Sequence, residues 1–177
     1  MPGSITNIAG YRFVDLDDCE RLQAIFDSLC QDLGLLGTIL LAKEGMNFFL
    51  AGTPAAIEGF VSFLETDDRF TGIPLKRSFT DYQPFNRMNV RLKQEIISVG
   101  IDRIRPVDFT GETIEPKAFK AMLDEGALVH VLDTRNDYEL RLGTFDNAID
   151  LNLETFRAFP EAIQNLPESM KDEPVVM

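Results

Sequence analysis

Three charged residues follow a short, mostly apolar run and form the clearest candidate site in this sequence. Asp133, Arg135 and Glu139 come directly after residues 128–132, which read Leu-Val-His-Val-Leu. Such a run predicts a strand buried on both faces of a parallel sheet, and ligands of these sheets gather at the carboxyl ends of the strands. At that position Arg135 either orients a reactive loop or an anionic group, or joins an internal salt-bridge network that holds the turn.

A basic segment lies in the middle of an otherwise acidic chain. The net charge of −12 argues against general nucleic-acid binding, because phosphate contacts need Lys and Arg. Residues 75–105 nevertheless hold seven basic and three acidic residues, whereas the segments on either side are acidic. The segment either forms a solvated strand face or binds RNA phosphates along a stripe. Its basic residues are Lys76, Arg77, Arg87, Arg91, Lys93, Arg103 and Arg105.

The two cysteines fit a structural role better than a reactive one. Cys19 and Cys30 share one face of a predicted helix with Leu22 and Phe26. Eleven helical residues rise about 16 Å, whereas a disulfide needs Cα atoms within about 7 Å. We therefore expect two unpaired thiols, either reactive or buried as small apolar groups, and the shared apolar face favours burial.

Other catalytic and metal-binding patterns are missing from the sequence. The single histidine, His130, lies in the apolar run and is expected in the core or at a sheet edge rather than as a catalytic base. No Cys/His cluster has zinc spacing, and no Gly-rich phosphate loop of either standard pattern is present. We predict no metal site, and the sequence leaves the cofactor unknown.

Residues 1–100 read as an α+β domain of the ferredoxin-like class. Strand patterns at 9–16, 37–42 and 46–51 alternate with two helices, and strand character returns at 74–80 and 87–99. The first helix carries the cysteines, is opened by Asp17 or Asp18 and is stopped by Gly34. Thr53-Pro54 opens the second helix. The resulting β-α-β-β-α-β order is typical of the ferredoxin-like fold, and a turn-rich linker follows at 101–111.

Residues 112–177 read as part of an α/β domain with a parallel sheet. A short helix is predicted over 115–123, followed by the buried strand at 128–132. Residues 153–166 predict a helix on either side of Pro160, and 175–177 begin another strand. No apolar run is long enough to cross a bilayer, and no secretory signal precedes the first strand. We therefore expect a cytoplasmic protein without membrane contact.

Several sequence blocks, in the right order, resemble the rhodanese-related tRNA uridine hydroxylases. Residues 37–47, 83–88 and 91–96 match that family in the first domain. Residues 129–139 and 143–149 resemble the first half of a rhodanese-like domain, with a strand ending in Asp-x-Arg and then a Gly-x-φ-x-x-Ala loop. The chain departs from the family after Asn47, where Phe48 and Phe49 replace the usual small residues.

The resemblance implies oxygen-dependent hydroxylation of the wobble uridine of tRNA to 5-hydroxyuridine. It gives Asp133, Arg135 and Glu139 supporting roles behind a catalytic loop, and it places the catalytic cysteine beyond Met177, so that residues 112–177 form an incomplete rhodanese-like domain. By the same resemblance the 177 residues alone are expected to be inactive. A rhodanese-type sulfurtransferase and a non-catalytic module that binds RNA or a partner remain alternatives.

Two kinds of partner follow from this interpretation. The first is tRNA, which we expect at Lys76, Arg77, Arg87, Arg91 and Lys93. The second is the missing C-terminal half, or another chain, that completes the rhodanese-like sheet. Without it, we expect residues from about 106 onward to fold poorly, because apolar faces would meet water.

Overall fold

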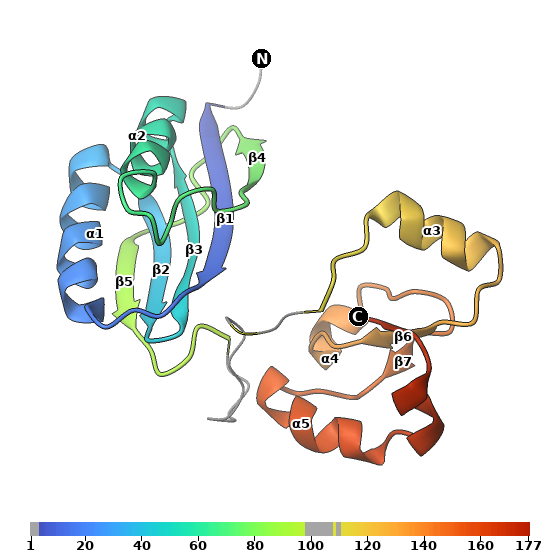
Figure 1. Cartoon of the computed structure of the whole chain (residues 1–177). Helices are drawn as coiled ribbons and strands as arrows, with labels where there is room; N and C mark the ends of the chain where they lie inside the picture. The colour runs from blue at the N-terminus through green and yellow to red at the C-terminus, as the bar shows by residue number, and fades with distance from the viewer. Residues whose placement is uncertain (1–3, 98–107, 109–110) are drawn as a thin grey trace. The chain divides into compact units, whose positions relative to one another are not determined.

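The protein is a mixed α/β protein made of two compact units. The computed structural model describes residues 4–97, 108 and 111–177. The first unit is formed mainly by Met1–Ile96 and the second mainly by Thr110–Met177 (Figure 1). Almost all of the predicted linker at 101–111, together with Arg103 and Arg105, lies outside the described residues. Among the described residues, no helix has both the length and the apolar character that a membrane crossing requires.

The first unit is a five-stranded mixed sheet with two helices. Its strands lie in the order β4-β1-β3-β2-β5, with β5 parallel to β2 and the other neighbours antiparallel. The predicted β-α-β-β-α-β order is present, and β5 adds a strand at one edge. In chain order the elements are β1 (Ile5–Phe13), α1 (Cys19–Leu33), β2 (Leu36–Ala42), β3 (Gly45–Gly52), α2 (Pro54–Leu64), β4 (Lys76–Thr80) and β5 (Met88–Leu92).

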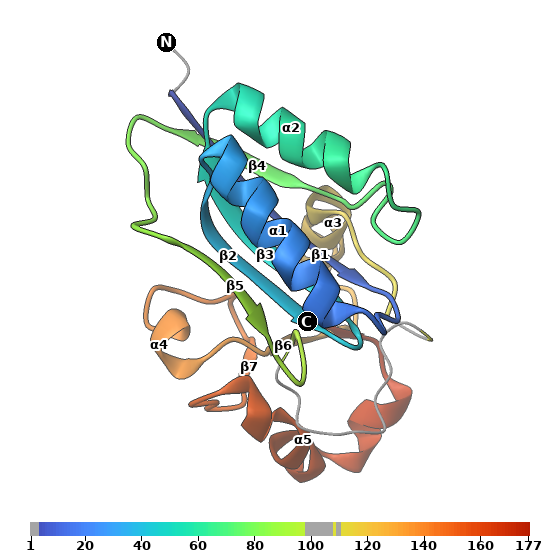
Figure 2. The same cartoon turned by 90° about the vertical axis from the view of Figure 1, so that its left-hand side faces the viewer.

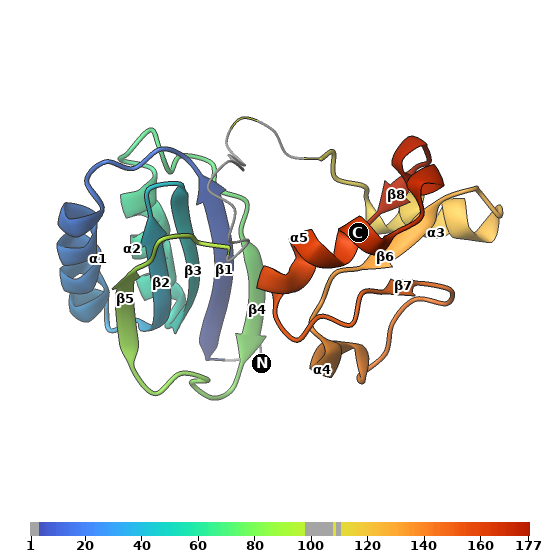
Figure 3. The same ribbon diagram turned by 90° about the horizontal axis from the view of Figure 1, so that it is seen from below.

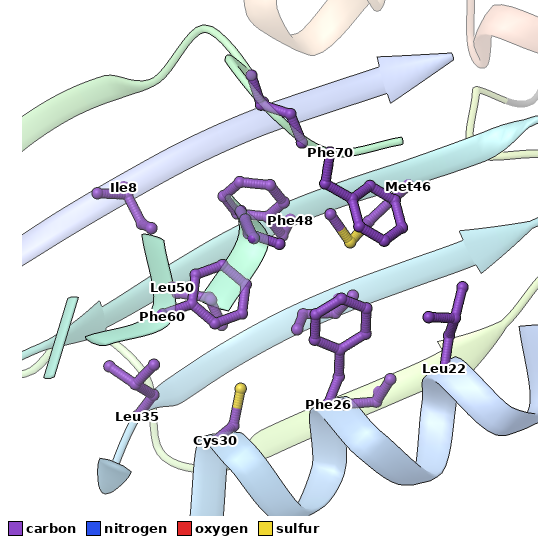
Figure 4. Close-up of a cluster of buried hydrophobic side chains, with 14 of the residues drawn as sticks. Ile8, Leu22, Phe26, Cys30, Leu35, Met46, Phe48, Leu50, Phe60 and Phe70 are labelled. Carbon is purple, nitrogen blue, oxygen red and sulfur yellow. The ribbon is translucent and has the colours of Figure 1, made fainter. Parts of the chain in front are cut away.

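Both helices pack on the same face of this sheet. In Figure 2, α1 and α2 lie in front of the strands, and Figure 3 shows the strands side by side in the order β5, β2, β3, β1 and β4. The core between them is aromatic: the Phe60 ring meets those of Phe26 and Phe48 at centroid distances of 6.0 and 5.5 Å (Figure 4). Burial of these rings, which are fully shielded from solvent, is the main stabilising contribution.

Local signals explain where the two helices begin and end. Gly34 ends α1 in the left-handed conformation, at φ 67°, as predicted. Thr53 caps α2 by accepting a hydrogen bond from the backbone N of Ala56 at 3.2 Å. Asp18 is the N-cap residue of α1 but makes no side-chain cap hydrogen bond. Its carboxylate instead accepts a hydrogen bond from Nη1 of Arg69 at 2.6 Å.

Several strand boundaries differ from the sequence-based prediction. β1 starts at Ile5 rather than at residue 9, because Ile5–Ala9 pair with β4, and it ends at Phe13. Beyond it, the N–H groups of Val14 and Leu16 donate to the turn between β2 and β3 instead of to a neighbouring strand. β4 begins at Lys76 rather than at residue 74. β5 ends at Leu92 instead of continuing toward residue 99, and residues 98 and 99 lie outside the described residues.

The second unit contains a small, wholly parallel sheet with strand order β7-β6-β8. The predicted strand at 128–132 begins only at His130, and Leu128 is 93% exposed, so that part of the prediction was wrong. Pro160 sits in the first turn of α5 rather than between two helices, because a first-turn residue needs no N–H donor. The elements are α3 (Pro116–Asp124), β6 (His130–Asp133), α4 (Asp137–Leu140), β7 (Ile149–Asp150), α5 (Phe159–Ala162) and β8 (Val175–Val176), with three short 3₁₀ turns between β7 and β8.

Candidate functional site

Asp133 and Arg135 form a closed charged network at the carboxyl end of β6. Nη2 of Arg135 donates to Oδ2 of Asp133 at 2.6 Å, and Nε donates to Oδ1 at 3.0 Å, so the contact is bidentate. The hydroxyl of Thr144 donates to the same Oδ2 at 2.6 Å. Nη2 of Arg135 also donates to the carbonyl of Gly143 at 2.8 Å. The network therefore ties the end of β6 to the loop before β7.

This arrangement fixes the charge of the carboxylate. The hydrogen bonds from Arg135 hold the pKa of Asp133 far below its usual range, although burial acts in the opposite direction. The Asp133 side chain is buried, whereas Arg135 is only partly covered. Asp133 is thus held as an anion whose hydrogen-bond partners are already in place.

Glu139 has a local role one turn later. Its carboxylate accepts a hydrogen bond from the backbone N of Asn136 at 3.2 Å and completes a capping box at the start of α4. Asp133 and Arg135 therefore share one network at the end of β6, whereas Glu139 lies in α4 and is not part of that network. The contacts of Asp133 and Arg135 are those of an internal network. Sequence reasoning missed Thr144, although its Gly-Thr loop belongs to the Gly-x-φ-x-x-Ala pattern.

An apolar hollow lies beside this network. Val131 and Leu132 of β6 line it together with Phe119 of α3 and Phe145 of the following loop. Asp133, Arg135 and Met177 also reach it. It therefore lies next to the carboxyl ends of parallel strands, where α/β proteins commonly bind ligands.

The structure does not gather the five predicted RNA-binding residues into one cluster. Lys76 and Arg77 lie on β4 and Arg91 on β5, and these strands form opposite edges of the sheet. Arg77 forms an ion pair with Glu58 of α2. Arg87 and Lys93 flank β5 at its two ends. In the described part of the chain, Lys76, Arg87, Arg91 and Lys93 have no ion pair.

The two cysteines take the places that their sequence context suggested, whereas the expectation of a core or sheet-edge histidine was wrong, because His130 lies partly exposed in the central strand β6. Cys19 and Cys30 lie on α1 and are unpaired, and Cys30 is fully buried. Burial raises the pKa of the Cys30 thiol to about 12 and also raises the pKa of Cys19. His130 lies in β6 and pairs with the carboxylate of Glu173.

Comparison with known proteins identifies the family. Residues 5–96 match the UPF0176 acylphosphatase like domain. Proteins named tRNA uridine(34) hydroxylase from Cupriavidus pinatubonensis and Cupriavidus necator are 45% and 44% identical over 97% of this chain and 63% of their own length. One from Thiobacillus denitrificans is 44% identical over 98% of this chain and 72% of its own length.

The match is not limited to the first unit. The chain spans a little under two thirds of the length of the two Cupriavidus proteins, and the similarity runs through both of its units. Identity of this level over nearly the whole chain places it in one family with those proteins. The chain belongs to the tRNA uridine(34) hydroxylase family.

Proposed function

We propose that this chain is part of an enzyme that hydroxylates the wobble uridine of tRNA to 5-hydroxyuridine in an oxygen-dependent reaction. One observation carries the proposal: 45% identity to a protein named tRNA uridine(34) hydroxylase over 97% of the chain. Sequence identity of this extent covers the turn at Asp133 as well as the first unit. Because the substrate is tRNA, the proposal implies a cytoplasmic enzyme.

We further propose that residues 1–100 are an RNA-binding ferredoxin-like domain and that 112–177 are the first half of a rhodanese-like domain. The wholly parallel sheet β7-β6-β8 and the network at the end of β6 support the second assignment. On this proposal the reactive cysteine belongs to the further length that the relatives possess. Asp133 and Arg135 then act as positioning residues that hold the turn behind the reactive loop, and Glu139 holds the helix that follows.

The proposed tRNA contacts use the basic residues around the edges of the first unit. Lys76, Arg87, Arg91 and Lys93 are free of ion pairs with described residues and are available to phosphates. Arg77 is already paired with Glu58, so we expect the smallest contribution from it. Each neutralised phosphate steepens the salt dependence of binding to single strands by about 0.7 in the log–log slope.

Nucleoside analysis of tRNA tests the proposed reaction. The gene that encodes the chain is deleted in its host, and tRNA nucleosides are quantified by mass spectrometry. We expect 5-hydroxyuridine to disappear and to return when the intact gene is supplied. An unchanged level of 5-hydroxyuridine in the deletion strain would exclude the proposed function. Thiosulfate:cyanide sulfur transfer by the intact gene product, measured in parallel, separates a hydroxylase from a sulfurtransferase.

A further inference from the structure

The face of the first unit's sheet that points away from α1 and α2 carries exposed aromatic rings. Along β1 the side chains alternate, so that Ile8 and Gly10 face the helices while Ala9 and Tyr11 face away. Ala9 pairs with Phe49 of β3, and cross-strand partners share a face. Tyr11 and Phe49 are 56% and 53% exposed. We call this surface the open face.

The two rings are placed as neighbours on the two adjacent strands β1 and β3. Tyr11 pairs with Asn47, two residues before Phe49, so the two aromatic residues are diagonal neighbours about 7–8 Å apart. Phe13 meets Tyr11 in a T-shaped contact with ring centroids 5.8 Å apart, which helps to fix the Tyr11 ring. Exposed aromatic rings on adjacent strands of a β-α-β-β-α-β sheet can each stack one unpaired base.

The charge of the sheet is opposite to that of the chain. The five strands contain no Asp or Glu and four basic residues, although the net charge of the protein is −12. Two of these basic residues lie on the open face. Lys76 pairs with Ala9. Arg91 pairs with Leu40, and Leu40 pairs with Asn47, which is the partner of Tyr11. They lie on the two edge strands, β4 and β5, with the aromatic residues between them.

A hollow beside Phe49 provides space for a base. Asn7, Lys76, Ser78 and Phe85 are among the residues that line it. The loop that carries Phe85 is held to the sheet, because Nε2 of Gln83 donates to the carbonyl of Ala51 at 3.1 Å. Amide and hydroxyl groups next to a stacking ring are the groups that read base edges in single-stranded RNA.

We infer that the open face binds single-stranded RNA, with bases stacked on Tyr11 and Phe49 and phosphates held by Lys76 and Arg91. The inference rests on the proposed function only for the choice of RNA as the ligand. Single-stranded RNA fits both features at once, because its phosphates meet the basic residues and its planar bases stack on the two aromatic rings. The absence of acidic side chains from all five strands favours a polyanion over a protein surface.

Binding of the 177-residue chain to fluorescent oligouridine, with an RNA duplex as the comparison, tests the inference. We expect Tyr11→Ala and Phe49→Ala each to weaken oligouridine binding about tenfold, in line with the loss of one stacked base. Lys76→Gln with Arg91→Gln should lower the salt slope by about 1.4, which corresponds to two phosphates. Tyr11→Phe should keep wild-type affinity, because the ring remains.

The opposite face of the sheet supplies a matched control. Phe79 of β4 is 58% exposed but pairs with buried Thr6, so it points to the side of the helices. Phe79→Ala should therefore leave affinity unchanged. Equal binding by wild type and by the Tyr11→Ala, Phe49→Ala double variant would overturn the inference, as would equal losses in the Phe79→Ala control. A change in oligomeric state with unchanged RNA affinity would overturn it in favour of a second copy of the chain.

The outcome is separable from that of the proposed function. If the aromatic variants bind normally while 5-hydroxyuridine still depends on the gene, the inference fails and the proposed function stands. If the aromatic variants lose RNA while 5-hydroxyuridine is independent of the gene, the RNA-binding face stands and the proposed reaction fails.

Discussion

Arg69 joins two carboxylates from separate parts of the first unit. Its guanidinium donates to Asp18 at the start of α1 at 2.6 Å and to Asp67, in the segment after α2, at 2.7 Å. These hydrogen bonds lower the pKa of both carboxyl groups. All three side chains are about one third exposed, so each contact is weaker than a fully buried pair would be.

Removal of Arg69 should reduce stability only where the two carboxyl groups are charged. Both folded-state pKa values are depressed, so the stabilisation is present above the unfolded pKa and is lost as the pH falls through the folded values. We expect Arg69→Gln to cost about 1–2 kcal/mol at pH 7 and much less at pH 2–3. Urea unfolding at both pH values measures the difference. A cost that is independent of pH would contradict this account.

Cys30 should behave as a core residue and not as a reactive thiol. Its pKa of about 12 leaves almost no thiolate at neutral pH, and the thiolate is the reactive form. We expect a thiol reagent at pH 8 to modify Cys30 only after unfolding in urea, and Cys30→Ala to lower the unfolding free energy by about 1–2 kcal/mol. Single variants of Cys19 and Cys30 assign each reaction. Rapid modification of Cys30 in the folded protein would show that the thiol is accessible.

At the scale of elements, the turn between β2 and β3 depends on a close backbone approach. Gly45 has φ 145°, and a Cβ built there would meet the carbonyl oxygen of Arg12 on β1 at 2.0 Å. Gly72 also has a positive φ, 68°, but a Cβ there meets nothing within 4 Å. A side chain at Gly72 would therefore meet only backbone strain, whereas a side chain at Gly45 would meet backbone strain and a steric clash.

Alanine substitutions at the two glycines should differ in cost. Gly72→Ala adds only the cost of a left-handed alanine, about 1 kcal/mol. Gly45→Ala must also push β1 away from the turn, so we expect a loss of about 3 kcal/mol or more. Chemical denaturation of the two variants measures both costs. Similar losses would mean that β1 can shift easily at this position.

The elements of the first unit could largely be predicted from sequence, because their signals are local. Gly34 and Thr53-Pro54 mark helix ends through backbone and capping chemistry that neighbouring residues determine. Strand pairing is not local. The positions of β4 and β5 at opposite edges follow from contacts between distant segments. The basic residues of these two strands are therefore close in sequence but far apart in the sheet.

The candidate sites show the same limit. Asp133 and Arg135 are two residues apart, so their proximity could be predicted, whereas the hydrogen bond from Thr144 required the loop to fold back. Phe48 and Phe49 are adjacent in the sequence, and the sequence alone does not show which of the two rings is buried. The pairing of β3 with β1 sends Phe48 into the core and Phe49 to the open face.

At the scale of the whole molecule, the two units differ in how well they cover their apolar residues. The first unit has a continuous core between sheet and helices. The second has a three-stranded sheet with short strands, and Leu142, which is 89% exposed, joins Leu128 and Met177 among its uncovered apolar side chains. If about 500 Å² of apolar surface stays exposed instead of being buried, the domain loses about 12 kcal/mol of stabilisation. This loss is as large as the free energy of unfolding of a typical domain.

Hydrogen exchange on the isolated 177-residue chain should therefore separate the units. We expect strong protection of the amides of β1 and β3 and weak protection of those of β6, since local stability follows the buried contacts. Strong protection of Val131 and Leu132 in a confirmed monomer of 177 residues would show that the second unit is self-sufficient.

The proposed function makes this chain part of an enzyme that acts on the wobble uridine of tRNA. The most direct measurement is mass spectrometry of the anticodon fragment of individual tRNAs from a strain that lacks the gene. We predict that uridine at position 34 loses the mass of one oxygen atom in that strain, that the intact gene and its Phe79→Ala variant restore it, and that the Tyr11→Ala, Phe49→Ala double variant restores it only in part. Position 34 with the same mass in the deletion strain and its parent would contradict the account.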